Sequence, residues 1–538
     1  MAGFRSASIL CGSALAIAVG ATPAASAQSS LVIDPQRGAT PTLPPPRTVP
    51  VAPSTSPAPT LAPAPSTLPP PPITLQPVRG TEPEASATPQ DLPVSDGNVL
   101  PAPSADPLSI DPGSDPILRL ARESGDPAVF RQSIQAAVGR HPSIAEAEAR
   151  RDEARAARNE ARTLELPVID LSLSYFRTID RAFSNDPQNV LERSRPTFRT
   201  DETLRLQAPV FDFGSAKSRI AAGNRRLEAS VAGIDDVSVQ LALRGVDSWY
   251  RVFGYRALVG LAESFLASQT ELRAAIAERV DQGVSAPGDV AQVESYIAAA
   301  QTQLAGFKRS LANAEAQYTQ VIGVSAPPGL GRAPTATLVP TSRERAELDS
   351  QNIPAVEAAR LNSIAARDDA RALRGDALPG LGVGVDAGRY GLLENAGDYD
   401  VRASVTLTQR LFGGATQRID QAKARARGAE ATYDRVRVEA ARDAAIAWSD
   451  VEALKESADA IENNYIATRQ SRDVLVERFR VSRGTLFDVL SAETNYFNVA
   501  SRYIETVTEL DIARYALLAR TGKLLDGFGI APARLDAR

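Results

Sequence analysis

The side chains that could do chemistry in this chain are charged groups, and none belongs to a recognisable catalytic set. The only histidine is His141, and its counterpart in the internal repeat described below is Ile353, so we expect no chemical role for it. Asp235-Asp236 and Asp368-Asp369 lie in helical stretches with no histidine or third carboxylate arranged as metal ligands. No nucleophile–base set, phosphate loop or nucleotide motif is present. We therefore predict that the protein is not an enzyme and uses no metal or cofactor.

Two carboxylates, Asp289 and Asp488, occupy equivalent positions of an internal repeat. The stretch Glu278–Val293 recurs as Glu477–Ala492, at an offset of 199 residues. The same offset relates Arg219-Ile220 to Arg418-Ile419, Trp249 to Trp448, and Gly323 to Gly522. A constant offset over about a hundred residues indicates a duplicated structural unit.

Each copy of this stretch predicts a helix, a short break and a second helix. The breaks fall near residues 283–288 and 481–485, which contain Gly and, in the first copy, Pro. We predict that each break is the tip of a long helical hairpin. From Ser215 to Gln282 the helical pattern is unbroken, and at about 1.5 Å per residue it gives a helix roughly 100 Å long. A helix of that length suits a tube or a rod rather than one globular core.

Strand patterns precede the long helices in both copies. Apolar residues alternate with polar ones, which predicts an antiparallel strand pair with one apolar face in each repeat. The apolar positions are Leu171, Leu173, Leu204 and Leu206 in the first repeat and Val383, Val385, Val405 and Leu407 in the second. Arg205, Asp386 and Arg402 fall on the polar face. If the apolar face meets lipid, these three face a pore; the alternative is a soluble sheet with an ordinary wet face.

Composition divides the remainder of the chain. Residues 1–27 have the pattern of a secretory signal, which contains the only cysteine, Cys11, and residues 28–117 form a Pro/Ala-rich extension that we expect to be disordered. Residues 118–340 and 341–530 are the two repeats, and 531–538 form a tail. The formal net charge of -5 implies no nucleic-acid partner. After residue 27 no apolar run is long enough for a transmembrane helix.

The order helix, strand, loop, strand, long helix, tip, long helix, present twice, resembles the TolC family of outer-membrane efflux and type I secretion channels. The segments Pro209–Gly214 and Arg410–Gly414 are similar to its strand-to-helix junctions, and Asp289-Val290 and Asp488-Val489 to its helix starts after the tips. The resemblance covers about residues 128–525. Four strands cannot close a barrel, for which about eight are the minimum, and an open sheet edge is forbidden in a membrane. Several chains must therefore share one barrel.

The resemblance implies a mainly α fold with a β-barrel portion. Four strands per chain would contribute to a trimeric 12-stranded outer-membrane barrel, continued by a periplasmic α-helical tunnel. The implied function is a passive exit duct of a tripartite efflux or type I secretion system. Its implied partners are a periplasmic adaptor (membrane fusion) protein, an inner-membrane pump that is ABC-type or proton-driven, and outer-membrane lipid.

The resemblance also implies roles for residues at the tips. Asp488 matches a family position that forms a carboxylate ring in the closed tunnel, whereas the next ring position is Ser491 here. Asp289 matches a position that pairs with a basic residue on the other hairpin, for which Arg483 is the candidate. The plainer interpretation of Asp488 is a solvated carboxylate at a helix start, near the positive end of the helix dipole.

Two alternatives stay open at this point. The chain could be the periplasmic adaptor itself, but one hairpin and β-rich modules would then be expected in place of two hairpins and two strand pairs. A periplasmic coiled-coil scaffold would leave the strand pairs unexplained. The cargo is open between small toxic compounds and a secreted protein.

Overall fold

The computed structural model describes residues 100–101, 103–104, 113–184, 187–336, 338–394 and 397–534. The expected signal sequence at 1–27 and most of the expected extension lie outside these residues. Contacts divide the chain into units at residues 1–87 and 88–538, and all the described residues belong to the second.

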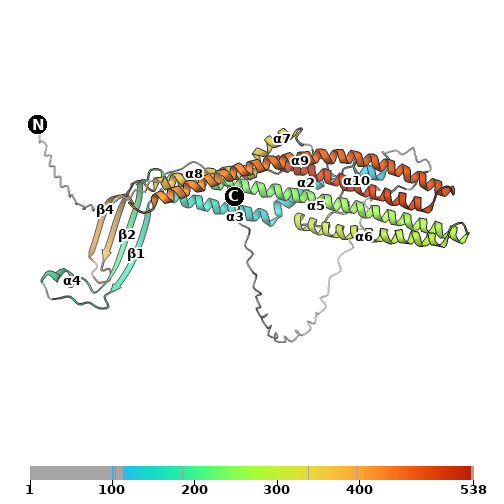
Figure 1. Ribbon diagram of the computed structural model, residues 1–538. Coiled ribbons are helices and arrows are strands. Elements are labelled where there is room, and N and C mark those ends of the chain that lie inside the picture. The colour runs from blue at the N-terminus through green and yellow to red at the C-terminus, as the bar shows by residue number, and fades with distance from the viewer. Residues whose placement is uncertain are drawn as a thin grey trace, which may run out of the picture. The chain divides into compact units, whose positions relative to one another are not determined.

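The second unit is a bundle of long helices with a β-sheet at one end and two helical hairpin tips at the other (Figure 1). Repeat 1 contains α2 (Pro127–Arg140), α3 (Pro142–Thr163), β1 (Val168–Arg177), α4 (Val190–Ser194), β2 (Phe198–Phe211), α5 (Ser215–Asp281) and α6 (Pro287–Ile322). Repeat 2 contains α7 (Arg343–Asp349), α8 (Pro354–Gly375), β3 (Gly380–Tyr390), β4 (Asp398–Thr408), α9 (Ala415–Arg480), α10 (Leu486–Arg520) and α11 (Leu524–Phe528). Helix α1 (Pro116–Leu120) precedes both. The predicted order of elements is therefore confirmed in each copy.

Prolines and glycines set the boundaries of these helices. Pro142 and Pro354 occupy the first turn of α3 and α8, where their fixed φ suits the helix and no donor is lost. The long helices α5 and α9 both start after a glycine with positive φ, Gly214 and Gly414. No helix in the described part of the chain is long and apolar enough to cross a membrane.

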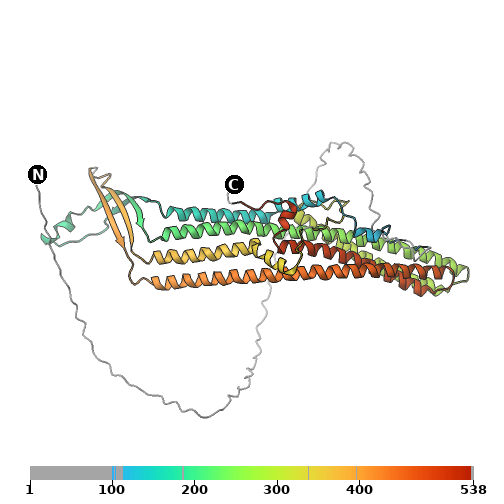
Figure 2. The same ribbon diagram turned by 90° about the horizontal axis from the view of Figure 1, so that it is seen from above.

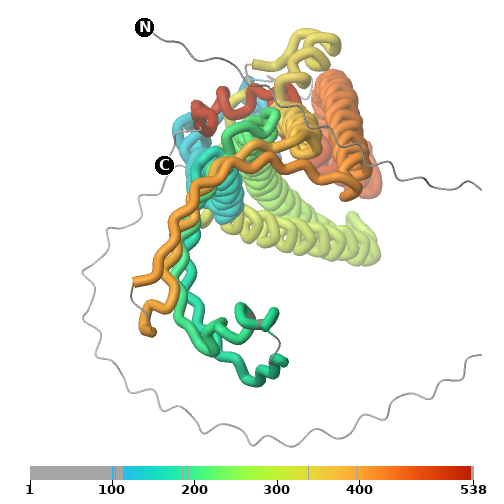
Figure 3. Tube along the Cα trace, turned by 90° about the vertical axis from the view of Figure 1, so that its left-hand side faces the viewer, coloured from blue at the N-terminus to red at the C-terminus, as the bar shows by residue number. Residues whose placement is uncertain are grey.

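The four strands form one antiparallel sheet in the order β1-β2-β3-β4. The two strand pairs predicted from the sequence are thus joined through β2 and β3, where Arg205 lies opposite Asp386. Both outer strands leave a backbone edge unpaired within the described chain. Viewed from the strand end, the sheet extends away to one side of the helices (Figure 3).

Beside the sheet, four helices lie in one layer in the order α3, α5, α8, α9 (Figure 2). Toward the tips, α6, α5, α10 and α9 follow one another in the same way. Alanine is frequent in the buried faces of these helices, which allows their backbones to approach closely. The main core lies midway, where Phe130 of α2 packs edge-on against Trp249, Tyr515 and Phe528.

The folded chain begins before residue 118, so part of the extension expected to be disordered is ordered. Asp115 is 1% exposed, caps α1 through the backbone N–H of Ile117 and Leu118, and accepts a hydrogen bond from Tyr465. Arg469 also pairs with Asp115. We call the described residues 100–101, 103–104 and 113–123 the N-terminal strap. These contacts lie before the expected boundary at residue 117, because a Pro-rich composition conceals a few anchoring side chains.

Candidate functional site: the hairpin tips and the charged row of the sheet

The first tip spans Gln282–Ala286, between α5 and α6, and the second spans Val481–Thr485, between α9 and α10. Gly283 and Ser482 turn the chain with positive φ, the latter in a conformation that is uncommon for a residue with a side chain. A small apolar cluster joins the two tips within one chain: Ile276 and Val293 from the first hairpin pack with Leu486 and Leu490 from the second.

Arg279 adds a polar contact between the tips. Its guanidinium lies 4.8 Å from the centre of the Phe479 ring, at the ends of α5 and α9. An arginine over an aromatic face is attracted by the negative charge density of the ring. Sequence reasoning did not find this contact, because a pair separated by 200 residues leaves no local pattern.

Asp488 is the third residue of α10 and belongs to a capping box. Thr485 Oγ1 accepts a hydrogen bond from the Asp488 backbone N–H at 3.2 Å, and Asp488 Oδ2 accepts from the Thr485 N–H at 3.2 Å and from its hydroxyl at 2.7 Å. These hydrogen bonds lower the pKa of the Asp488 carboxyl, because they favour its charged form. Asp488 is therefore a carboxylate that caps the start of α10, as the plainer interpretation expects. A place in a ring of carboxylates around the tunnel would be a second role, in addition to this cap.

Asp289 holds the equivalent position at the start of α6. Its Oδ2 accepts a hydrogen bond from the Ala286 backbone N–H at 3.1 Å. Arg483 is exposed, and among the described residues of one chain the hydrogen bond given for the Asp289 carboxylate comes from Ala286, not from Arg483. A lock between Asp289 and Arg483 would therefore join hairpins of two neighbouring copies.

The polar face of the sheet carries a row of alternating charges. The strand register places Asp170, Arg205, Asp386 and Arg402 directly opposite one another across β1, β2, β3 and β4. We call these four residues the charged row. Arg205 Nε lies 2.7 Å from Asp386 Oδ1, and Arg402 pairs with Asp400 on its own strand. All four lie on the polar face, as three of them were predicted to do; Asp170 was missed because its partners are visible only from the register.

The opposite face is apolar and exposed to its surroundings. The eight apolar residues expected to face lipid share this face, because directly paired residues of an antiparallel sheet lie on the same side. Leu171 of β1 and Val405 of β4 are 69% and 73% exposed, whereas Leu204 and Val385 of the inner strands are 44% and 40% exposed. A sheet face of this kind, uncovered in one chain, requires lipid or protein to cover it.

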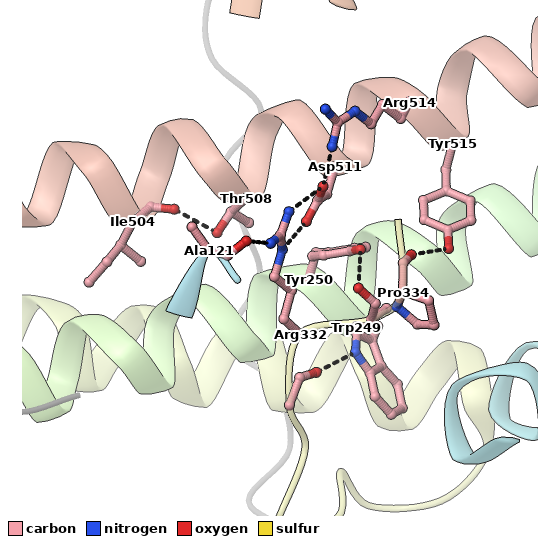
Figure 4. Close-up of polar contacts among 12 residues, drawn as sticks. Ala121, Trp249, Tyr250, Arg332, Pro334, Ile504, Thr508, Asp511, Arg514 and Tyr515 are labelled. Atoms are coloured by element: carbon pink, nitrogen blue, oxygen red, sulfur yellow. Dashed lines mark hydrogen bonds and ion pairs between the residues drawn. The ribbon is translucent and has the colours of Figure 1, made fainter. Parts of the chain in front are cut away.

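A buried ion pair connects the two repeats midway along the bundle (Figure 4). Arg332, in the linker after α6, binds both carboxylate oxygens of Asp511 on α10, at 2.6 and 3.0 Å, and also donates to the Ala121 carbonyl of the strap. Burial acts against the charged guanidinium, but the carboxylate outweighs it and the pKa of Arg332 is raised. The same linker receives hydrogen bonds from Trp249 and Tyr515. This cluster holds the linker between α5 and α10.

His141, Asp235 and Asp236 make hydrogen bonds that hold the structure together. His141 caps α3 by accepting a hydrogen bond from the Ser143 backbone N–H at 3.2 Å. Asp235 accepts from the Ala533 backbone N–H, and Asp236 from Gln240. Within the residues that the structure describes, no group of three or more His, Asp or Glu side chains is placed to hold a metal ion.

Comparison with known proteins gives a consistent result. The profile of the outer membrane efflux protein family matches residues 133–324 and 348–523, which together make up well over half of the chain. Outer membrane efflux protein BepC from Brucella suis is 26% identical over 335 residues, covering 61% of this chain and 73% of BepC. Protein CyaE from Bordetella pertussis is 24% identical over 329 residues, covering 59% of this chain and 69% of CyaE.

Solved structures show the same fold. The CmeC outer membrane channel of Campylobacter jejuni superposes with a TM-score of 0.65 at 15% identity, over 73% of this chain and 86% of CmeC. The outer membrane protein VceC of Vibrio cholerae gives 0.63 at 20% identity, over 73% and 96%. The predicted resemblance, the mainly helical fold with its sheet and the outer-membrane location are confirmed. This chain belongs to the outer membrane efflux protein family.

Proposed function

We propose that three copies of this chain form one continuous duct for export across the periplasm and the outer membrane. The observation that carries the proposal is the sheet, which has one exposed apolar face, one charged face and two unpaired edges. In a bilayer every backbone hydrogen-bonding group must be paired, so such a sheet needs further strands from other copies. Three copies supply twelve strands, which can enclose a channel.

In this assembly the charged row and its neighbours face the pore, and the eight apolar residues face lipid. The long helices extend the barrel into the periplasm as a tunnel, and the tips close its far end. Asp488 would then appear three times around the narrowest point. Both hydrogen bonds that the Asp488 carboxylate accepts within the capping box end on Oδ2, which leaves Oδ1 to attract cations in the lumen.

The tips are also the proposed docking site of a periplasmic adaptor, which connects the duct to an ABC-type or proton-driven inner-membrane pump. Three large apolar side chains are exposed there, Val284, Val481 and Phe487, each between 54% and 61%. Solvent-exposed apolar side chains grouped at one end of a molecule favour a protein partner. Family membership supports efflux or type I secretion as the process served.

Site-specific cross-linking in cells tests this assignment. A photoreactive residue at Phe487 should capture a periplasmic adaptor protein, identified by mass spectrometry. The matched control is the same probe at Leu393, which is equally apolar, more exposed and at the strand end of the molecule. Capture of the same protein at both positions, or of no periplasmic protein at Phe487, would contradict docking at the tips.

A further inference from the structure

The hairpin of α9 and α10 holds a buried cluster of charged groups beneath the N-terminal strap. Arg472 of α9 is 2% exposed and lies between two carboxyl groups, 2.6 Å from Asp473 Oδ1 and 3.3 Å from Glu493 Oε1. Its guanidinium also lies 4.5 Å from the centre of the Tyr496 ring, whose hydroxyl is 2.7 Å from that of Tyr465. One positive charge thus faces two carboxyl groups that are almost fully withdrawn from water.

The strap closes this cluster with its backbone. Arg472 donates a hydrogen bond to the Pro101 carbonyl at 2.9 Å, and the Ser104 backbone interacts with the Asp473 carboxyl. Asp473 is fully buried and Glu493 is 4% exposed. The burial of the two carboxyl groups therefore depends on the strap being in place.

The charges in and beside the cluster do not balance. Asp115 of the strap is 1% exposed and pairs with Arg469 of α9. This pairing leaves Arg472 to compensate both Asp473 and Glu493. Three buried carboxyl groups therefore face two guanidinium groups. The arginines of the strap form their ion pairs elsewhere, Arg119 with Glu123 and Arg122 with Glu462.

The equivalent place on the first hairpin has balanced charges in contact with water. There the ion pair of Arg273 and Glu294 occupies the repeat-equivalent positions, and its side chains are 45% and 51% exposed. The side chains of Arg472 and Glu493 are 2% and 6% exposed. An alanine stands where α9 has Asp473. The additional carboxyl group and its burial are thus properties of the second hairpin.

We propose that attachment of the strap to α9 and α10 takes up one proton from solution, which Asp473 and Glu493 share. Two buried carboxyl groups beside one guanidinium leave an uncompensated charge when both are ionised, and one proton removes it. When the strap is detached, both carboxyl groups reach water, as Glu294 does, and can ionise together. In the folded protein the pKa of each is raised, because the loss of solvent outweighs the attraction of Arg472.

The direction of the pH dependence follows from this linkage. A carboxyl group whose pKa is higher in the attached state favours attachment fully below its ordinary pKa, and this contribution is lost as the pH rises through the raised pKa. The strap should therefore hold most firmly in an acidic periplasm. Arg472 lies about 12 Å from the end of α9 at Arg480. Detachment at higher pH would uncover the hairpin beside the second tip.

Hydrogen–deuterium exchange of the full-length chain in detergent tests the proposal. Protection of the amides of residues 115–123 is measured relative to an unstructured peptide at each pH, which removes the intrinsic pH dependence of exchange. Protection should rise as the pH is lowered from about 8 to about 5, by up to about tenfold per pH unit. Glu493→Gln and Asp473→Asn should each keep the strap protected at the higher pH and remove the pH dependence.

Two controls separate attachment of the strap from general stability. Glu294→Gln, at the equivalent position of the first hairpin, should behave like the original chain. Amides of α5 near Trp249 report on the fold as a whole. Strap protection that is independent of pH, that falls on acidification, or that changes in parallel with these α5 amides would overturn the proposal. A pH dependence that survives both Glu493→Gln and Asp473→Asn would overturn it as well.

Discussion

Val405 and Thr406 are neighbours on β4 whose side chains lie on opposite faces of the sheet. We predict that Val405→Arg impairs membrane insertion much more than Thr406→Arg. An arginine on the lipid face costs about 2–4 kcal/mol near the bilayer midplane, whereas changes in the lumen mainly affect selectivity. The amount of folded protein in outer-membrane fractions measures the difference. Equal losses for the two variants would mean that the two faces have been assigned incorrectly.

Asp511 is 1% exposed and holds Arg332 by two hydrogen bonds. Asp511→Ala leaves a buried guanidinium without its partner, and we expect the free energy of unfolding to fall by about 3–5 kcal/mol. The control is Glu347→Ala, which removes an exposed i,i+4 pair with Arg343 and should cost about 0.3–0.5 kcal/mol. Urea unfolding in detergent compares them. Similar midpoints for both variants would show that the pair does not hold the repeats together.

At the scale of elements, the second tip combines a helix cap with a candidate gate. We predict that Asp488→Asn reduces cation selectivity and weakens block by multivalent cations in planar-bilayer recordings. Asp289→Asn, at the equivalent position of the first tip, is the comparison: if it pairs with Arg483 of a neighbouring copy, its loss and Arg483→Ser should each raise resting conductance. Unchanged selectivity and block in Asp488→Asn would leave the residue with its capping role only.

The pH dependence of this tip follows from the lowered pKa of Asp488. A carboxyl group with a lowered folded pKa stabilises the fold above its unfolded pKa, and that contribution is lost as the pH falls through the folded pKa. The hydrogen bonds from Thr485 also oppose the rise in pKa that three neighbouring carboxylates would impose. Cation selectivity should therefore persist from neutral pH through the ordinary carboxyl range and disappear only below it. The prediction is contradicted if the original protein loses cation selectivity near pH 6 and Asp488→Asn shows no such change with pH.

The N-terminal strap leads to a prediction about truncation. Deleting residues 28–87 removes none of the described contacts and should leave assembly intact. Deleting residues 28–116 also removes Asp115 and the Pro101 carbonyl, to which Arg472 donates at 2.9 Å. Tyr465, the half-buried Arg469 and the buried Arg472 then lose these partners. Thermal melting of the purified proteins should show a clear loss of stability for the longer deletion alone. Equal melting temperatures for the two deletions would mean that the contacts of the strap do not stabilise the fold.

Local patterns account for the parts of this structure that the sequence predicted. The long helices follow from unbroken helical periodicity, the strands from two-residue alternation, and the start of α10 from Thr485 and Asp488 at the spacing of a capping box. Contacts between distant residues left no such pattern. Arg332 and Asp511 are 179 positions apart, and Asp115 lies in a Pro-rich stretch whose composition favours disorder.

At the scale of the whole molecule, one chain leaves several of its surfaces without a partner. Its sheet has two open edges and an uncovered apolar face, and α9 lacks the neighbour that α5 possesses. In the proposed ring, a rotation that places repeat 1 of another copy beside repeat 2 covers the open edges and the open side of α9, and lipid covers the apolar face. A ring also brings the tips together, where the gate and the adaptor site are proposed.

The copy number of the protein extracted from outer membranes tests this account most directly. Native mass spectrometry in mild detergent should give a single species with three copies of the processed chain. Because the barrel cannot close with the four strands of one chain, the trimer should persist on dilution. A stable, folded monomer in the same detergent would contradict the shared barrel, and with it the proposed duct.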